Sequence, residues 1–256
     1  MVNMKAKELK YFNGNKCYEG EFKDDEYDGK GVTYNYNGSK KYEGEYKNGN
    51  YDGKGILYLN GNILYKGEFK NDHSNGTGIL YLDGNILYEG AFKDGEYYGK
   101  GIKYYSNGTK QYEGEFKDGK YYGIGILYLD CNKLYEGKFK DGDYDGKGIL
   151  YLDGKKLYDG EFSNGEYCGN GIKYYSDGTK EYEGEFEDNK YNGNGISLYM
   201  NSNIIKYKGN FKNEKYDGYG IKYYNTYQKK YEGEFKNGKL YKGVSYYKNG
   251  NIKMVT

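Results

Sequence analysis

Hydrophobic and polar residues alternate with a period of two along almost the whole chain. From Tyr112 to Lys117, tyrosine, glycine and phenylalanine alternate with charged residues, and residues 125–129 form a second, largely apolar run. Such alternation is typical of half-buried β-strands, and no window shows the sustained 3.6-residue period of an amphipathic helix. Asp118-Gly119 lies between the two runs, and Asp-Gly favours the positive φ of tight hairpin turns. The pattern therefore predicts an all-β chain of short hairpins with almost no helix.

This hairpin recurs at a nearly constant interval. Its marker is Tyr-x-Gly followed two residues later by an aromatic residue, and the marker tyrosines are Tyr18, Tyr42, Tyr65, Tyr88, Tyr112, Tyr135, Tyr158, Tyr182, Tyr207 and Tyr231, spaced 23 to 25 residues apart. Asn107-Gly108, Asp153-Gly154 and Asp177-Gly178 are expected to turn the chain from one unit into the next. A fixed period of this length indicates a repeat architecture whose neighbouring units pack on each other. We expect about ten repeats over roughly residues 7–247, with half-units at 9–12 and 244–248.

The repeated segment resembles a known family. YEGEFKDGKYYGIGILYLD, which begins at Tyr112, is similar to the MORN (membrane occupation and recognition nexus) consensus Y-x-G-x-[FW]-x-x-G-x-x-x-G-x-G. The resemblance implies an elongated, twisted, single-layer antiparallel sheet of consecutive hairpins, solenoid-like and open at both ends, with a shallow groove along one face. We therefore expect residues 1–256 to form a single array of such repeats.

The two faces of such a sheet are expected to differ. Glycine between two aromatic residues weakens a strand unless a neighbouring ring covers its bare backbone. In the second strand of each unit an isoleucine and the tyrosine two residues later hardly vary, as at Ile126 and Tyr128, whereas their neighbours vary, as at Leu127 and Lys103. We infer that the constant pair shares a face with the rings and glycines of the first strand, and that the charged and leucine residues occupy the other face. This aromatic face is the expected partner-binding groove, lined by Tyr88, Phe92, Tyr104, Tyr112, Phe116, Tyr128, Tyr135, Phe139, Tyr151, Tyr158, Phe162 and Tyr174.

Composition supports a folded chain with a thin core. Only 36% of the 256 residues are hydrophobic and the mean hydropathy is −1.12, yet 40 residues are tyrosine. Disordered chains are poor in aromatic residues. The net charge is +1 without a basic stripe, which argues against nucleic acid as a partner. The segment from Met1 to Lys10 lacks the apolar core of a secretory signal, and no apolar run is long enough to span a membrane. We expect a cytoplasmic protein, with membrane or cytoskeletal association as an alternative.

Catalytic and metal-binding patterns are missing from the sequence. His73 is the sole histidine, and Cys17, Cys131 and Cys168 form no CxxC pair; histidine-paired nucleophiles and zinc sites need more. Asp141 to Gly146 copies half of an EF-hand loop, but Leu152 stands where that loop needs a bidentate acid. We therefore expect no enzymatic activity, no metal and no cofactor.

Three functions remain open from the sequence. The first is a protein-binding scaffold that docks a helix or peptide of a partner, because a concave row of aromatic residues suits both. The second is a peripheral membrane or phospholipid-binding module, as the family name implies, and the third is a regulator in trans of the antitoxin or immunity type. The open strand edges also predict end-to-end homodimerisation, and the resemblance places it at the C-terminal end.

Overall fold

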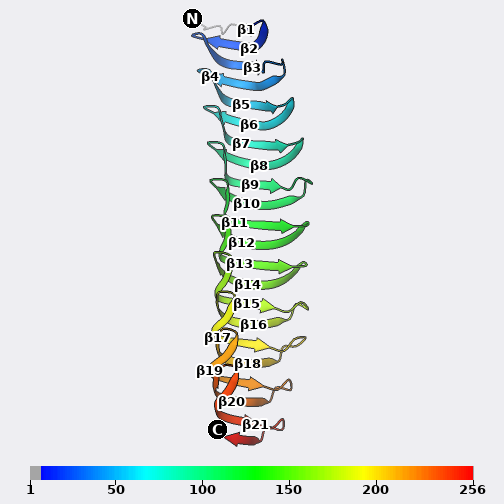
Figure 1. Cartoon of the computed structure of the whole chain (residues 1–256), viewed down its shortest axis with the longest axis vertical. Helices are drawn as coiled ribbons and strands as arrows, with labels where there is room; N and C mark the ends of the chain where they lie inside the picture. The colour runs from blue at the N-terminus through cyan, green and yellow to red at the C-terminus, as the bar shows by residue number, and fades with distance from the viewer. Residues whose placement is uncertain (1–6, 256) are drawn as a thin grey trace. The chain divides into compact units, whose positions relative to one another are not determined.

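The structure is a computed structural model that describes residues 7–255, and it divides into two units, residues 1–131 and 132–256. The first unit contains β1 (Lys7–Phe12), β2 (Asn15–Lys23), β3 (Glu26–Tyr34), β4 (Lys40–Lys47), β5 (Asn50–Leu59), β6 (Asn62–Lys70), β7 (His73–Leu82), β8 (Asn85–Lys93), β9 (Glu96–Tyr104), β10 (Lys110–Lys117) and β11 (Lys120–Leu129) (Figure 1). The second contains β12 (Asn132–Lys140), β13 (Asp143–Leu152), β14 (Lys155–Ser163), β15 (Glu166–Tyr174), β16 (Lys180–Glu187), β17 (Lys190–Leu198), β18 (Ile205–Lys212), β19 (Lys215–Tyr223), β20 (Lys229–Lys236), β21 (Lys239–Tyr246) and β22 (Ile252–Val255).

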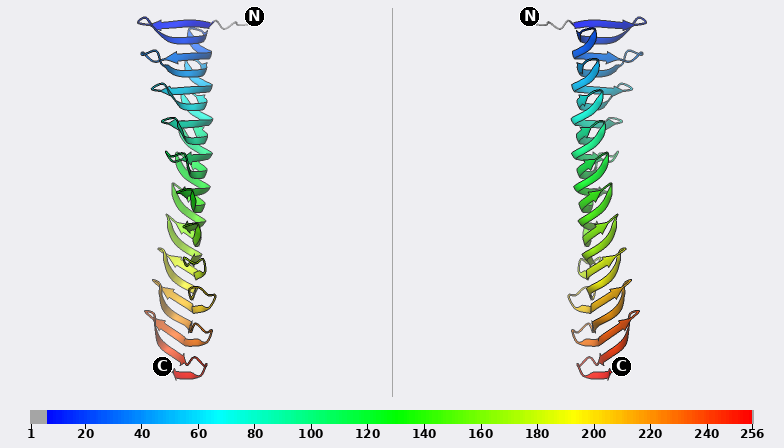
Figure 2. Two further views of the ribbon diagram at one scale, coloured as in Figure 1. Left: turned by 90° about the vertical axis from the view of Figure 1, so that its right-hand side faces the viewer. Right: turned by 90° about the vertical axis from the view of Figure 1, so that its left-hand side faces the viewer.

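Within each unit, strands that are consecutive in the chain pair antiparallel with one another. The hairpins therefore follow one another in sequence order, and the two side views show them stacked one above the next within each unit (Figure 2). Residues 7–255 include no helix, and so none that could cross a bilayer. The all-β, hairpin-repeat prediction is confirmed. The sequence analysis predicted that Met1 to Lys10 is not a secretory signal. The first six residues of that segment, Met1 to Ala6, lie outside the described residues.

Two kinds of turn join the strands. Asp118 and Gly119 have φ of 49° and 76°, and Asp153 and Gly154 have φ of 50° and 74°, so both pairs adopt the predicted left-handed conformation. At Asn107-Gly108 only the glycine has positive φ. Here the Asn107 side-chain oxygen accepts hydrogen bonds from the backbone N–H and the hydroxyl of Thr109, at 3.0 and 2.6 Å. These turns therefore form a longer loop held by its asparagine or aspartate.

The second strand of each hairpin is longer than predicted and bends sharply. β11 begins at Lys120 rather than at Gly125. Gly114 pairs with Gly125 and Glu115 with Tyr122, so two residues bulge out of β11, and the bulge contains Gly123 with φ of 62°. A bulge bends its strand and increases its local twist. The strand thus continues through the bulge, because the pairing resumes on both sides of it.

Aromatic rings form the core of each unit. The ring of Tyr112 stacks on that of Tyr121 with centroids 3.9 Å apart, and Phe116 meets it edge-on at 5.0 Å. Phe116 also packs edge-on against Tyr88 of the preceding repeat at 5.1 Å. Offset-stacked and edge-to-face pairs of this kind each contribute about 0.5–1.5 kcal/mol beyond area burial. The three-ring motif recurs in both units, except that Ser74 and Leu240 replace the stacked tyrosine in two hairpins. Neighbouring repeats within a unit are therefore held together by ring contacts.

These rings cover bare backbone, as predicted. The Tyr112 hydroxyl lies against Gly125 and donates a hydrogen bond to the backbone oxygen of Glu115 at 3.0 Å. Its ring therefore fills the space that a side chain at Gly114 or Gly125 would need.

The assignment of the constant isoleucine and tyrosine to the ring face was wrong. Tyr112 pairs with Leu127, and Glu113 pairs with Ile126. Directly opposed residues of an antiparallel pair lie on the same face, so Leu127 shares the ring face while Ile126 lies with the glutamate. The reason is parity: Ile126 follows Gly125 by one residue, and Gly125 faces the rings.

The C-terminal half-unit also differs from expectation. Residues 244–246 belong to β21, and a further strand, β22, pairs with it through Ser245 and Met254. Within the described residues, β1 pairs with β2 alone and β22 pairs with β21 alone.

Candidate binding groove

The predicted site residues fall into two groups on opposite faces. The eight residues of the first strands are buried in the ring face, with exposed fractions from 0% to 4%: Tyr88, Phe92, Tyr112, Phe116, Tyr135, Phe139, Tyr158 and Phe162. Burial raises the pKa of Tyr112 well above its usual value. Rings this deeply packed against one another have no free surface for a partner. The predicted aromatic groove is therefore not formed by these side chains.

The other four predicted residues lie on the opposite face, which we call the groove face. Tyr104, Tyr128, Tyr151 and Tyr174 are half-buried there and stand two residues after the constant isoleucines. The Tyr104 hydroxyl donates a hydrogen bond of 2.5 Å to the Glu89 carboxylate. Burial, followed by this bond, raises the pKa of Tyr104 to about 12. This face therefore combines tyrosine, isoleucine and carboxylate side chains.

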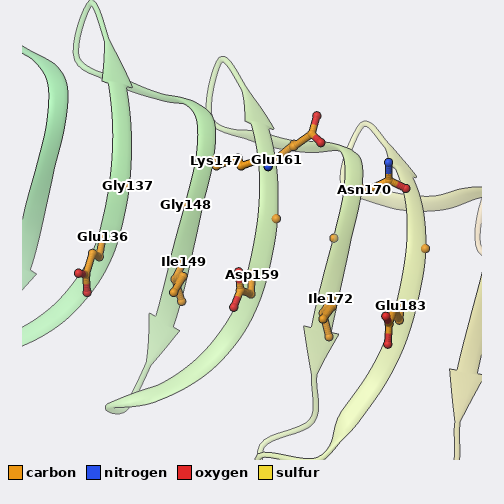
Figure 3. A pocket seen from close by; sticks show the side chains of 13 residues that line it. Glu136, Gly137, Lys147, Gly148, Ile149, Asp159, Glu161, Asn170, Ile172 and Glu183 are labelled. Atoms are coloured by element: carbon orange, nitrogen blue, oxygen red, sulfur yellow. The ribbon is translucent and has the colours of Figure 1, made fainter.

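Hollows lie along the groove face in both units. In the second unit a hollow of 570 Å³ extends from Glu136 to Gly184, and Figure 3 shows its side chains. In the first unit, hollows of 440 Å³ and 330 Å³ occupy the equivalent positions around Gly101 and Gly31. Paired glycines form the floor of each hollow. Isoleucine and acidic residues line one side, as at Ile149 and Asp159.

One row of side chains along the groove face alternates between aliphatic and charged residues. Each member pairs directly with the next across the strands: Glu19, Val32, Glu43, Ile56, Lys66, Ile79, Glu89, Ile102, Glu113 and Ile126 in the first unit, and Glu136, Ile149, Asp159, Ile172, Glu183, Ile196, Lys208, Ile221, Glu232 and Val244 in the second. We call this the isoleucine–carboxylate row. The isoleucine or valine that follows each Gly-x-Gly marks this row in the sequence. The sequence analysis placed that residue on the ring face, whereas it lies on the groove face.

Apart from Glu89, which accepts the hydrogen bond of Tyr104, the carboxylates of this row form ion pairs with lysines three residues earlier in the same strand. Lys110 reaches Glu113 at 2.8 Å and Lys156 reaches Asp159 at 2.8 Å, with all four side chains about 40% exposed. Exposed ion pairs contribute only about 0–1 kcal/mol. A partner's own lysine or glutamate can therefore exchange into them at small cost.

The histidine and the metal-ligand types singled out in the sequence are dispersed in the described residues. The exposed His73 has its Nδ1 2.8 Å from the backbone oxygen of Asn71, within a turn. Within residues 7–255 no group of three histidine, cysteine, aspartate or glutamate side chains is placed to hold a metal ion.

Comparison with known families agrees with the repeat geometry. The MORN repeat model matches ten segments of the chain: 18–40, 42–63, 65–86, 88–110, 112–129, 135–154, 158–180, 182–204, 207–229 and 231–240. Each segment starts at one of the marker tyrosines, and in the first nine the ring of that tyrosine covers the paired glycines. No curated protein matches the sequence.

Proposed function

Because the chain belongs to the MORN repeat family, we propose that it is a non-catalytic scaffold that docks a helix or peptide of a partner protein. MORN repeats are associated with membrane and protein binding. The docking surface of this proposal is the groove face rather than the ring face. The rings of the ring face are packed against one another, whereas the isoleucines of the groove face are half-buried and accessible to a partner.

The spacing of the isoleucine–carboxylate row carries the proposal. Successive aliphatic members, such as Ile149 and Ile172, are two strands apart, which corresponds to about 9.6 Å at roughly 4.8 Å per strand. Seven residues of an α-helix span about 10.5 Å. An amphipathic helix lying across the strands therefore presents one apolar side chain per heptad to one isoleucine. Extended peptides also fit, with about three residues per two strands.

The charged members of the row suit the same kind of partner. Asp159 lies between Ile149 and Ile172 and is held by Lys156. A helix whose apolar residues meet the isoleucines places polar residues between them, opposite the ion pairs. Such alternation favours one register of docking over others, because charges placed against isoleucine lose hydration.

Site-specific photo-crosslinking in cells tests the proposal. A photoreactive phenylalanine analogue is placed at Ile149, at Ile172 or, as a matched control, at Leu152. Leu152 belongs to the same unit, is 59% exposed and lies on the opposite face. We expect covalent adducts to one protein at the two groove positions and none at the control. Equal labelling at all three positions, or none at the groove positions, would contradict the proposal.

Two competing functions give different outcomes in parallel experiments. Peripheral lipid binding predicts co-sedimentation with liposomes that is insensitive to Ile149→Asp and Ile172→Asp. A regulator in trans predicts that the crosslinked protein is an enzyme or toxin whose activity falls when it is bound. A scaffold predicts that the captured partner keeps its activity while bound.

A further inference from the structure

The ring pattern is interrupted at the last hairpin. Phe235 pairs with Leu240. At the equivalent position the other hairpins carry a stacked tyrosine such as Tyr216, apart from the hairpin with Ser74. Ser245 pairs with Met254, whereas the corresponding residue Lys222 pairs with Tyr231 in the preceding repeat. Two rings of the regular motif are thus replaced by smaller, flexible side chains.

A cavity of 490 Å³ lies where these rings are missing. Leu240 and Met254 lie in its wall, and four lysines line it: Lys222, Lys230, Lys239 and Lys253. Among the described residues that line this cavity there is no aspartate or glutamate. We call it the lysine pocket. Its charge contrasts with the hollows of the groove face, each of which includes several carboxylates.

Loss of a ring changes the surroundings of Lys222. In earlier repeats the equivalent lysines lie over the stacked tyrosine of the following repeat, Lys103 over Tyr121 and Lys173 over Tyr191. With leucine at position 240, the Lys222 ammonium lies instead over Tyr216 of its own repeat, 5.1 Å from the ring centroid.

Like charges gather around this lysine. Burial, followed by the charges of Lys230 and Lys206, lowers the pKa of Lys222. The surrounding chain is also basic, since residues 222–255 contain eight lysines and only Glu232 and Glu234 as acids. Glu232 is engaged on the opposite face by Lys229 at 2.8 Å. The cluster therefore lacks an internal counter-charge in its own cavity, and a bound anion would relieve the repulsion between its lysines.

Tyrosine side chains complete the pocket. The Tyr224 hydroxyl donates a hydrogen bond of 3.0 Å to the backbone oxygen of Tyr246, which holds the Tyr224 ring beside Lys230, whose ammonium lies 5.3 Å from its centroid. Lys230 is at the same time 5.5 Å from the Tyr231 ring. These contacts restrict the lysine before any ligand arrives, which reduces the entropy lost on binding.

We propose that the lysine pocket binds a phosphate-bearing ligand, either a soluble organic phosphate or the phosphorylated headgroup of a lipid. A phosphate monoester carries about −1.5 to −2 charges and three acceptor oxygens, and the four lysines that line the cavity supply the matching positive charge and N–H donors. Small-molecule pockets measure roughly 300–1,000 Å³, so this cavity holds more than one phosphate group. The site is separate from the groove face and does not depend on peptide docking there.

Calorimetric titration of the full chain with pyrophosphate at 150 mM salt tests the site in solution. We expect saturable binding of one pyrophosphate per chain, weakened at least tenfold by Lys222→Gln and by Lys230→Gln. Lys173→Gln is the matched control, because Lys173 holds the same position in an earlier repeat where the stacked tyrosine is present. This control should leave the affinity unchanged.

Leu240→Tyr separates the pocket from general surface charge. It restores the residue of the regular repeat and fills the cavity while every lysine is kept, so we expect it to abolish binding. A thermal melt at or above that of the unmodified protein verifies that this variant folds. No saturable binding of pyrophosphate or vesicles, or binding that Leu240→Tyr leaves intact, would overturn the proposal.

Vesicles distinguish the two sources of phosphate. Phosphatidylcholine vesicles are compared with vesicles that also contain phosphatidic acid, in the same protein and in the Leu240→Tyr variant. Binding to the acidic vesicles that Leu240→Tyr abolishes, without pyrophosphate binding, assigns the site to a lipid headgroup. Pyrophosphate binding without vesicle binding assigns it to a soluble ligand.

Discussion

The hydroxyl oxygen of Tyr112 lies 2.3 Å from the point that a Cβ atom on Gly125 would occupy. Tyr112 and Gly125 are on neighbouring strands, and the ring covers the glycine backbone while its hydroxyl caps the backbone oxygen of Glu115. The repeated glycines therefore exist to admit a ring. This relationship recurs along the chain and holds a sheet together that has no second layer.

Gly125→Ala tests this relationship directly. The new methyl group would clash with the Tyr112 ring, which is held in place by its hydrogen bond to the Glu115 backbone oxygen. We therefore expect the free energy of unfolding to fall by about 1–3 kcal/mol, as in other overpacked cores. Gly154→Ala is the control, because no atom lies within 4 Å of its Cβ position and only its φ of 74° is strained. Urea unfolding followed by circular dichroism measures both. Equal losses in the two variants would show that ring contact is not the cause.

Ser74→Tyr should stabilise the first unit. Ser74 pairs with Phe69 at the position where Tyr97 of the next repeat stacks on Tyr88 at 3.9 Å. Adding the missing ring over Tyr65 should raise the free energy of unfolding by about 0.5–1.5 kcal/mol. Ser74→Ala provides the comparison that removes the hydroxyl without adding a ring. A lower unfolding midpoint for Ser74→Tyr than for Ser74→Ala would contradict the stacking account.

Alkaline pH should unfold the protein cooperatively. Burial raises the pKa of Tyr18, Tyr65 and Tyr121 to about 12, from an ordinary value of 10. The folded state thus holds these protons more tightly than the unfolded state, so their contribution is complete below pH 10 and is lost between pH 10 and 12. Ionisation of each such tyrosine lowers the free energy of unfolding by about 1.4 kcal/mol per pH unit in that range. Absorbance at 295 nm and circular dichroism should change together, and gradual ionisation with intact circular dichroism would contradict this.

We propose that the outer edge of β22 pairs with a second copy of the chain. In the described residues β22 pairs only with β21, and Ile252 and Val255 are 62% and 70% exposed. Unpaired strand edges are templates for such contacts. Light scattering should report twice the 29.6 kDa chain mass at high concentration, and Met254→Pro should return it to one chain. A mass of 29.6 kDa at every concentration would exclude the dimer.

The sequence alone determined the repeat and its core. Alternation in segments such as 112–117 implied strands, Asp118-Gly119 implied the hairpin turn, and rings around glycine implied that rings cover bare backbone. It also contained the information that the face assignment missed, since Ile126 is one residue from Gly125 and must point away from the rings. Parity along a strand is local, and therefore sequence can encode it.

The tertiary structure decided which surface is open. The strands bend at bulges such as the one that contains Gly123, and this curvature depends on backbone torsions that period-two alternation does not specify. It also brought Lys222, Lys230 and Lys253 around Leu240, although these residues are distributed over four strands. Each departure from the repeat is visible in the sequence. That these residues line one cavity follows from strand pairing and register, which only the folded chain fixes.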